Sequence, residues 1–312
     1  MTVSVCIVTY NSASDINECL DAVNNQSYPV ATIVVIDNAS TDSSVEQVRK
    51  FVSRHASITL IENNVNIGFA GGQNQAIAAT NTDYVLVLNP DVVLHADYIR
   101  ELVNRLEQDS RAGSATGLLV LKADPSIVDS SGLQMGNNRH VIDRGTGESV
   151  EHWLKPGEVF GPSGAAALYR RRMIEDIKLE GEFFDERFFA YKEDVDVAWR
   201  ARLLGWSSYY VPSAKADHAR GWQKGGRRNI SLFVRQHSYM NQLYMLVKNE
   251  QLSLHLFKVL PILVAREAAK LVYMLIRERD LLKSWKTIIR TLPEMVRKRK
   301  ALNEKINKLN TN

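Results

Sequence analysis

Cysteines and long apolar runs are scarce in this chain of 312 residues. Its two cysteines, Cys6 and Cys19, show no metal-ligand spacing, and a chain of this length buries enough apolar surface to fold without disulfides. We therefore expect both thiols to be reduced core residues. No run of about 18 uncharged apolar residues occurs, so we expect no membrane-spanning helix. The opening TVSVCIVTYN has no preceding basic stretch, which predicts a first strand and a cytoplasmic protein rather than a secreted one.

Two common nucleotide-binding motifs are also missing. The chain has no G-x-G-x-x-G after a predicted strand and no P-loop lysine motif, which excludes a dinucleotide fold and a P-loop NTPase. A sugar nucleotidyltransferase needs basic residues in an early triphosphate loop, but the first Lys or Arg here is Arg49. What is present is a glycine-rich segment, NIGFAGGQN at 66–74, before a short predicted helix. Its glycines allow close backbone approach to an anionic ligand.

Acidic residues are sparse at the C-terminal end. Residues 251–312 hold 14 basic and 5 acidic side chains, whereas the other 250 residues hold 25 basic and 30 acidic ones. The pattern is helical from 229 onward, and apolar residues at spacings of three and four fall on one helix face: Leu281, Leu282, Trp285, Ile288, Ile289, Leu292 and Val296. This basic extension suits an anionic membrane surface, a contact in a homo-oligomer, or packing on the body of the protein. No nucleic-acid-reading motif accompanies it, so we expect no nucleic acid partner.

The first 120 residues alternate strand and helix signals. Strands are predicted at 3–9, 32–36, 58–61 and 84–88, and helices at 14–25, 43–51, 70–79 and 96–106. Apolar strands that are each followed by a helix predict an α/β fold with a mainly parallel sheet covered on both faces. From 122 to 158 the pattern weakens, which predicts a loop-rich insertion or flap, and a further strand is expected at 165–169.

Polar residues follow three of these strands: Thr9-Tyr10-Asn11, Asp37-Asn38 and Asn89-Pro90-Asp91. Ligands of such sheets bind at the carboxyl ends of the strands, although Asn and Asp are also ordinary turn formers. The carboxylate of Asp91 is suited to a divalent cation whose other ligands are diphosphate oxygens, and His218 is a candidate second protein ligand.

A dense acidic and aromatic segment, EFFDERFFAYKEDVDVAWRAR, spans 182–202. Glu193 and Asp194 open its predicted helix, where the helix dipole favours carboxylates. They either cap the helix or supply a general base.

Six segments in order resemble family 2 glycosyltransferases of the GT-A fold, and within them the bacterial rhamnosyltransferase-like branch. They are VSVCIVTYNS, VVIDNASTDSS, NVNIGFAGGQNQAI, YVLVLNPDVV, FFDERFFAYKEDVDVAWRARLLGW and YYVPSAKADH, and they cover 3–220. Asn89 stands where the family's Asp-x-Asp motif has its first aspartate. The resemblance does not extend over the last 60 or so residues.

The resemblance implies a role for each matching residue. Asp194 matches the catalytic base, while Asp91 and His218 match the ligands of Mg²⁺ or Mn²⁺. The donor-binding positions are Thr9, Tyr10, Asn11, Asp37, Asn38, Gly68, Gly71, Asn74, Asn89 and Asp91. Weaker candidates for the diphosphate or acceptor are Glu193, Gly164, Arg220, Trp222 and Arg227.

The implied activity is inverting, metal-dependent transfer of a sugar from a nucleotide diphosphate to a hydroxyl of a cell-surface glycan precursor. The branch suggests dTDP-L-rhamnose as donor, UDP-hexoses and UDP-N-acetylhexosamines stay open, and a non-catalytic nucleotide-sugar-binding protein is the remaining alternative. The acceptor is expected to be a glycan, free or linked to polyprenyl diphosphate at the inner membrane face. We expect a catalytic domain over 1–228, with a nucleotide half at 1–120 and an acceptor half at 121–228, and a basic helical extension over 229–312.

Overall fold

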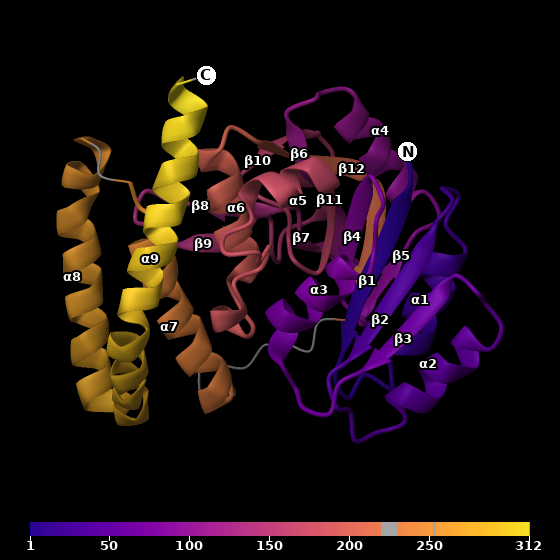
Figure 1. Cartoon of the computed structure of the whole chain (residues 1–312), viewed down its shortest axis with the longest axis horizontal. Coiled ribbons are helices and arrows are strands. Elements are labelled where there is room, and N and C mark those ends of the chain that lie inside the picture. Colours follow the sequence, from indigo (N-terminus) through magenta and orange to yellow (C-terminus); the bar gives the residue numbers. More distant parts are fainter. Residues whose placement is uncertain (220–229, 252–253, 312) are drawn as a thin grey trace.

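The structure, a computed structural model, describes residues 1–219, 230–251 and 254–311. A twisted sheet with helices on both faces makes up most of the molecule, and three long helices stand beside it (Figure 1). This is a mixed α/β architecture with a helical C-terminal region, as the sequence predicts.

The N-terminal half has the predicted alternation. It contains four strands, β1 (Val3–Thr9), β2 (Thr32–Asp37), β3 (Ile58–Glu62) and β4 (Tyr84–Leu88). One helix follows each strand: α1 (Ile16–Asn24), α2 (Ser44–Val52), α3 (Gly68–Ala78) and α4 (Tyr98–Glu107). Strand β1 pairs in parallel with both β2 and β4, and β2 pairs in parallel with β3. Because these strands run the same way, their carboxyl ends meet at one edge of the sheet.

The second half completes the sheet with strands of both directions. Strands β6 (Ala112–Leu121), β11 (Ala166–Arg170) and β12 (Ser207–His218) extend it in the order β10-β12-β6-β11-β4-β1-β2-β3. Strand β11 runs antiparallel to both neighbours, β12 runs parallel to β6, and the short β5 (Val92–Leu94) pairs antiparallel with β12. This last pairing brings the end of β12 next to the turn that follows β4.

The prediction of a loop-rich insertion at 122–158 was wrong. This region contains β7 (Asp124–Ser130), β8 (Leu133–Met135), β9 (Val141–Asp143), a 3₁₀ turn η1 (Val150–Trp153) and β10 (Gly157–Val159). Strand β7 pairs with β6, β10 pairs with β12, and β8 with β9 form a separate two-stranded sheet. These strands are short, and each buries only one or two apolar side chains, among them Val128, Leu133, Val141 and Val159, so local hydrophobic alternation gives little signal.

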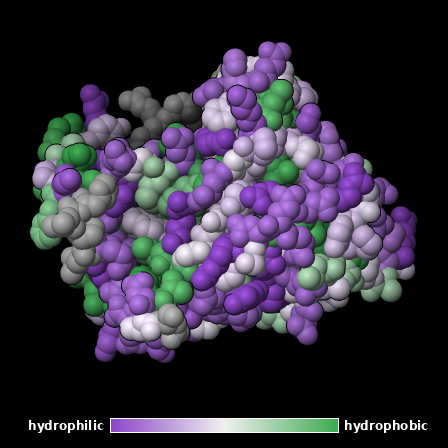
Figure 2. All heavy atoms as spheres, turned by 90° about the horizontal axis from the view of Figure 1, so that it is seen from above, coloured by the Kyte–Doolittle hydropathy of each residue, from purple (hydrophilic) through white to green (hydrophobic). Residues whose placement is uncertain are grey.

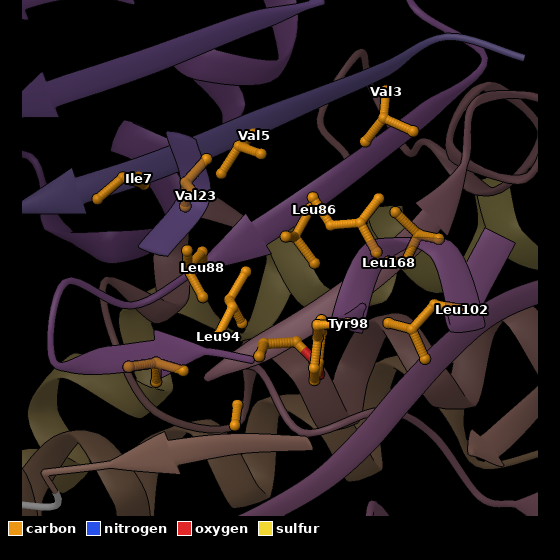
Figure 3. Close-up of a cluster of buried hydrophobic side chains, with 14 of the residues drawn as sticks. Val3, Val5, Ile7, Val23, Leu86, Leu88, Leu94, Tyr98, Leu102 and Leu168 are labelled. Atoms are coloured by element: carbon orange, nitrogen blue, oxygen red, sulfur yellow. The ribbon is translucent and has the colours of Figure 1, made fainter. Parts of the chain in front are cut away.

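Apolar side chains fill both faces of the sheet. On one face, residues of β1 and β4 pack against α1 and α4, with Val3, Val5, Ile7, Leu86 and Leu88 at its centre (Figure 3). On the other face, α3, α5 (Arg171–Ile177) and α6 (Glu193–Leu203) cover the sheet, and a short 3₁₀ turn η2 (Glu186–Phe188) precedes α6. Both cysteines are free and buried, which confirms the expectation for them.

The C-terminal region consists of α7 (Leu232–Asn249), α8 (Leu254–Arg277), a 3₁₀ turn η4 (Arg279–Lys283) and α9 (Ser284–Thr311). No helix within the described ranges is long and apolar enough to cross a bilayer. The apolar residues predicted to share one helix face are divided between two environments. Leu281 and Ile288 are buried, whereas Trp285, Ile289, Leu292 and Val296 are 36–64% exposed. The buried side of α9 is instead Ser284, Ile288, Thr291, Met295, Lys298 and Leu302, because α7 and the catalytic body contact that side.

A buried ion-pair network joins the C-terminal helices to the body. The ammonium group of Lys248 on α7 lies 2.5 Å from Asp185 and 2.9 Å from Asp196 on α6. Lys298 on α9 lies 2.7 Å from Asp185, and Arg200 pairs with Asp196 at 2.9 Å. Burial raises the pKa of Asp185, but the two ammonium groups outweigh it and hold that pKa below its ordinary value. Three helices far apart in sequence therefore meet around one set of charges.

Candidate active site

A cavity of about 530 Å³ opens where the turn after β4, the end of β12 and the start of α6 converge. Six of the predicted site residues line it: Asn89, Asp91, Gly164, Glu193, Asp194 and His218. The cation-binding candidates and the proposed base thus share one cavity although they come from distant segments. Its remaining wall includes Asp129, Tyr191, Lys192 and Ser238 of α7.

Asp194 is held in a fixed orientation by two backbone groups. The N–H of Gly164 donates to Oδ2 at 3.0 Å, and the N–H of Val195 donates to Oδ1 at 2.7 Å. A Cβ atom on residue 164 would lie 3.2 Å from Oδ2 of Asp194, so glycine allows this close approach. Burial raises the pKa of Asp194 above its ordinary value, although the Gly164 N–H opposes the shift. A carboxylate with a raised pKa is a stronger base than a solvated one.

Glu193 lines the same cavity, and its pKa is also raised. Burial and the neighbouring charge of Asp194 raise the pKa of Glu193 to about 8. Its Oε2 atom is buried without a hydrogen-bond partner within the described part of the chain. Adjacent carboxyl groups with perturbed pKa values are typical of sites that move protons, and Asp194 is the one that accepts hydrogen bonds from the N–H groups of Gly164 and Val195.

His218 lies between two carboxylates. Its Nδ1 is 2.7 Å from Oδ2 of Asp129, and its Nε2 is 3.4 Å from Oδ2 of Asp91. Burial lowers the pKa of His218, but both carboxylates raise it, and the result is about 9. A carboxylate on one ring nitrogen orients the other nitrogen and strengthens it as a metal ligand. Asp129, which sequence reasoning missed, therefore fixes the ring so that Nε2 faces Asp91.

These residues fit a divalent cation that is only partly enclosed by protein. No cluster of three or more His, Cys, Asp or Glu side chains suited to a metal ion occurs among the described residues, so there is no closed cage. Asp91 is 29% exposed at its side chain and faces the cavity beside His218. An oxygen and a nitrogen ligand beside an open space leave the remaining positions for water and phosphate oxygens, as Mg²⁺ and Mn²⁺ prefer.

Four other predicted donor-binding residues, Thr9, Tyr10, Asn11 and Asp37, lie at the ends of β1 and β2, outside this cavity. Oγ1 of Thr9 and Oδ1 of Asp37 are buried and have no hydrogen-bond partner among the described residues. Both are pairing neighbours in the β1–β2 ladder. Tyr10 is 51% exposed, and the Asn11 side chain accepts a hydrogen bond from the Thr41 N–H at 2.8 Å. Buried polar oxygens without a partner are uncommon, so this pair marks the edge of the sheet at β1 and β2 as a candidate ligand site.

Four further candidates are engaged with protein. The Asn38 amide donates to the Gly68 carbonyl at 2.9 Å, and the Asn74 amide donates to Phe184 O at 2.8 Å and accepts from Phe184 N–H at 2.9 Å. Gly68 has φ +83°, and a Cβ there would overlap Phe189, while one on Gly71 would lie 3.3 Å from Ile67. These contacts join α3 to β2 and to the segment before α6, so they shape the site.

A second missed residue is Asn241 of α7, which is fully buried. Its side-chain nitrogen lies 2.9 Å from the Phe188 and Ala190 carbonyl oxygens and 2.7 Å from that of Tyr191. The segment it holds has left-handed backbone at Tyr191 and Lys192, immediately before Glu193. The helical extension therefore positions the start of the catalytic helix. The weak candidates Arg220, Trp222 and Arg227 lie outside the described residues.

Comparison with known proteins agrees with this geometry. The model of glycosyl transferase family 2 matches residues 4–178, more than half of the chain. The chain belongs to glycosyl transferase family 2. The enzyme is therefore a glycosyltransferase with the GT-A fold.

Among curated relatives of this family 2 enzyme is an N-acetylglucosaminyl-diphospho-decaprenol L-rhamnosyltransferase of Mycobacterium tuberculosis. It is 29% identical over 244 residues, which are 71% of this chain and 77% of that protein. A low-salt glycan biosynthesis hexosyltransferase of Haloferax volcanii is 28% identical over 64% of this chain and 61% of its own length.

Solved structures share the fold. A mannosyltransferase from Pyrobaculum calidifontis, in complex with GDP-Man and Mn²⁺, superposes with a TM-score of 0.59 at 19% identity and covers 98% of this chain and 86% of its own. GalNAc-T7 with UDP, GalNAc and Mn²⁺ superposes with a TM-score of 0.62 at 14% identity, and this match spans 80% of this chain but 48% of that one.

Proposed function

We propose that this family 2 glycosyltransferase transfers a single sugar, with inversion, from a nucleotide-diphosphate donor to a hydroxyl of a lipid-linked glycan precursor. The observation that carries the proposal is that Asp194 lines the same cavity as Asp91 and His218. An acceptor hydroxyl in that cavity has a base on one side and the donor diphosphate site on the other. In-line displacement in this geometry inverts the anomeric carbon.

The chain's own groups have distinct tasks in this reaction. Asp194, fixed by the N–H groups of Gly164 and Val195, takes the proton from the attacking hydroxyl. Asp91 and His218 would hold Mg²⁺ or Mn²⁺, which neutralises charge on the departing diphosphate. The unsatisfied oxygens of Thr9 and Asp37 are placed for the nucleotide.

We propose dTDP-L-rhamnose as the donor, because the mycobacterial relative carries the name of an L-rhamnosyltransferase. UDP-hexoses and UDP-N-acetylhexosamines are the second candidate class, because a poly-beta-1,6-N-acetyl-D-glucosamine synthase of Staphylococcus epidermidis is 23% identical over 68% of this chain and 48% of its own length.

We further propose that the enzyme acts in the cytoplasm at the inner membrane face. The catalytic unit is assigned to 1–228 and the helical extension to 229–312.

Donor hydrolysis without acceptor tests the proposal. Release of nucleotide would be followed for dTDP-L-rhamnose and for UDP-glucose, UDP-galactose and UDP-N-acetylglucosamine, with Mn²⁺ and with chelator. We expect one donor to be cleaved much faster than the rest, and only with metal. Asp194→Asn should keep donor binding and lower turnover by about 10²–10⁴, the usual contribution of a general base. Full turnover in this variant, or metal-independent hydrolysis, would contradict the mechanism.

A further inference from the structure

A second cavity, of about 680 Å³, lies between α7 and α8 and adjoins the active site. Tyr191, Lys192 and Ser238 line both cavities, so the two spaces share a wall. A ligand that fills the second cavity therefore ends beside the cavity that contains Asp194.

Cations are concentrated on this second cavity. Lys192, Arg235, Arg266 and Lys270 all line it. Arg266 and Lys270 share the carboxylate of Glu267 at 2.8 and 2.9 Å, and Arg235 pairs with Glu278 at 3.1 Å. Glu267 and Glu278 face three of the four cations and Asp194 lies near Lys192, so the cations outnumber the carboxylates at this wall.

Neighbouring titratable groups respond to this charge. Burial lowers the pKa of Lys192, and Arg266 and Lys270 lower it further, although Asp194 opposes them. Burial and the same three cations lower the pKa of His140, which also lines the cavity. The cavity is therefore electropositive, and a bound anion would relieve the repulsion among its cations.

Much of the rest of the lining is apolar. Val234, Tyr239, Met274 and Leu281 line the cavity beside Tyr273, which is 44% exposed on α8. On another face, α8 exposes large apolar side chains: Leu271, Val272, Leu275 and Ile276. Figure 2 shows hydrophobic residues gathered at the end of the molecule that α8 occupies. An apolar chain that leaves the cavity and passes around α8 would reach this apolar surface.

We propose that the α7–α8 cavity binds the diphosphate of a lipid-linked acceptor, whose lipid chain leaves along α8 and whose first sugar reaches Asp194. A diphosphate esterified at both ends carries about two negative charges at neutral pH, which suits a lining where cations outnumber carboxylates. Lys192, placed between the cavities, contacts the phosphate nearest the sugar. This inference rests on the proposed transfer to a lipid-linked precursor and assigns the residues that recognise it.

Farnesyl diphosphate is the probe, because it carries both the charged and the apolar part. Its binding to the full-length protein would be measured by calorimetry without any donor, beside inorganic pyrophosphate and farnesol. We expect farnesyl diphosphate to bind at least about tenfold more tightly than either fragment, since each lacks one half of the contacts. Equal affinity of pyrophosphate or of farnesol would overturn the proposal.

Two variants locate the binding. Arg266→Gln/Lys270→Gln should weaken farnesyl diphosphate binding by about tenfold or more, because it removes charged hydrogen-bond donors. The matched control is Lys286→Gln/Arg290→Gln, which removes the same charge from exposed positions on α9 and should change affinity less than about twofold. An equal loss in both variants would mean general electrostatic attraction and would overturn the proposal.

Ala269→Phe provides a test that leaves every charge in place. Ala269 lines the cavity on an exposed part of α8, so a phenyl ring there fills space without disturbing the core. We expect weaker farnesyl diphosphate binding with an unchanged melting temperature, and unchanged affinity would overturn the proposal. Donor hydrolysis by the unmodified protein is measured separately. A protein that hydrolyses no donor would count against the proposed transfer. The farnesyl diphosphate measurements test the α7–α8 cavity independently of that activity.

Discussion

Nδ1 of His218 lies 2.7 Å from Oδ2 of Asp129, a residue 89 positions earlier in the chain. Both side chains are buried, with 7% and 1% of their surface exposed. This pair determines which ring nitrogen of His218 faces Asp91, and so it orients one side of the cation site that we propose.

Asp129→Asn should weaken metal-dependent donor binding. The amide cannot stabilise the His218 ring as the carboxylate does, and loss of such a supporting contact commonly costs about 10–100-fold in metal affinity. Nucleotide titration with Mn²⁺ and with chelator measures the effect, which should appear only with Mn²⁺. Asp217→Asn is the control, since Asp217 pairs with the exposed His95 and lies outside the cavity. Equal losses in the two variants would refute the role given to Asp129.

Gly164→Ala should lower kcat with little change in donor KM. The new methyl group would lie 3.2 Å from both Cβ and Oδ2 of Asp194 and displace the base from its backbone donors. A misplaced catalytic group commonly costs on the order of 10²-fold in rate. Steady-state kinetics would be compared with Gly157→Ala, because a methyl group at Gly157 meets nothing within 4 Å. Unaltered kcat in Gly164→Ala would show that the contact with Asp194 is not needed.

The protein should lose stability as pH rises towards 8, partly because of Glu193. Its pKa is raised from 4.5 to about 8 in the folded protein, so between these values the folded state binds more protons than the unfolded state. Stability therefore falls with rising pH over that window, by an amount on the order of a few kcal/mol. Glu193→Gln removes the titrating group and should flatten the dependence.

Urea unfolding at a series of pH values measures this effect. The control is Glu46→Gln on α2, an exposed carboxylate that should leave the slope unchanged. If the unfolding free energies of Glu193→Gln and the unmodified protein ran parallel from pH 5 to 8, Glu193 would not be protonated as described.

Lys298→Met should destabilise the whole enzyme. Lys298 is 2% exposed and pairs with Asp185 at 2.7 Å, so its loss leaves part of a buried negative charge uncompensated. Breaking a buried pair from one side typically costs about 3–5 kcal/mol. Arg297→Gln is the adjacent control, because Arg297 pairs with Glu180 at the surface, where solvent screens the pair, and its loss should destabilise the protein much less. Denaturant midpoints of equal value in the two variants would contradict this account of the network.

Much of the fold could be predicted from sequence because its strongest signals are local. The apolar runs of β1, β2 and β4 and the helix start at Glu193 need no knowledge of distant residues. The edge of the sheet that binds ligands could also be predicted from the sequence, since parallel strands place Asp37 and Asp91 at the same end of the sheet. The strands between 122 and 158 escaped prediction because most are only three residues long, too short to show alternation, and because they form by pairing with strands elsewhere in the fold.

The amino-acid sequence by itself determined the α/β alternation, the family and the identity of the carboxylates that could react, because each depends on residue type and spacing within a short segment. Only the tertiary structure decided that Asp129 orients His218, that Gly164 holds Asp194 and that Asn241 and Lys298 join the C-terminal helices to the catalytic body. Those contacts connect segments from 30 to 113 positions apart, and chain folding alone brings their atoms within hydrogen-bonding distance.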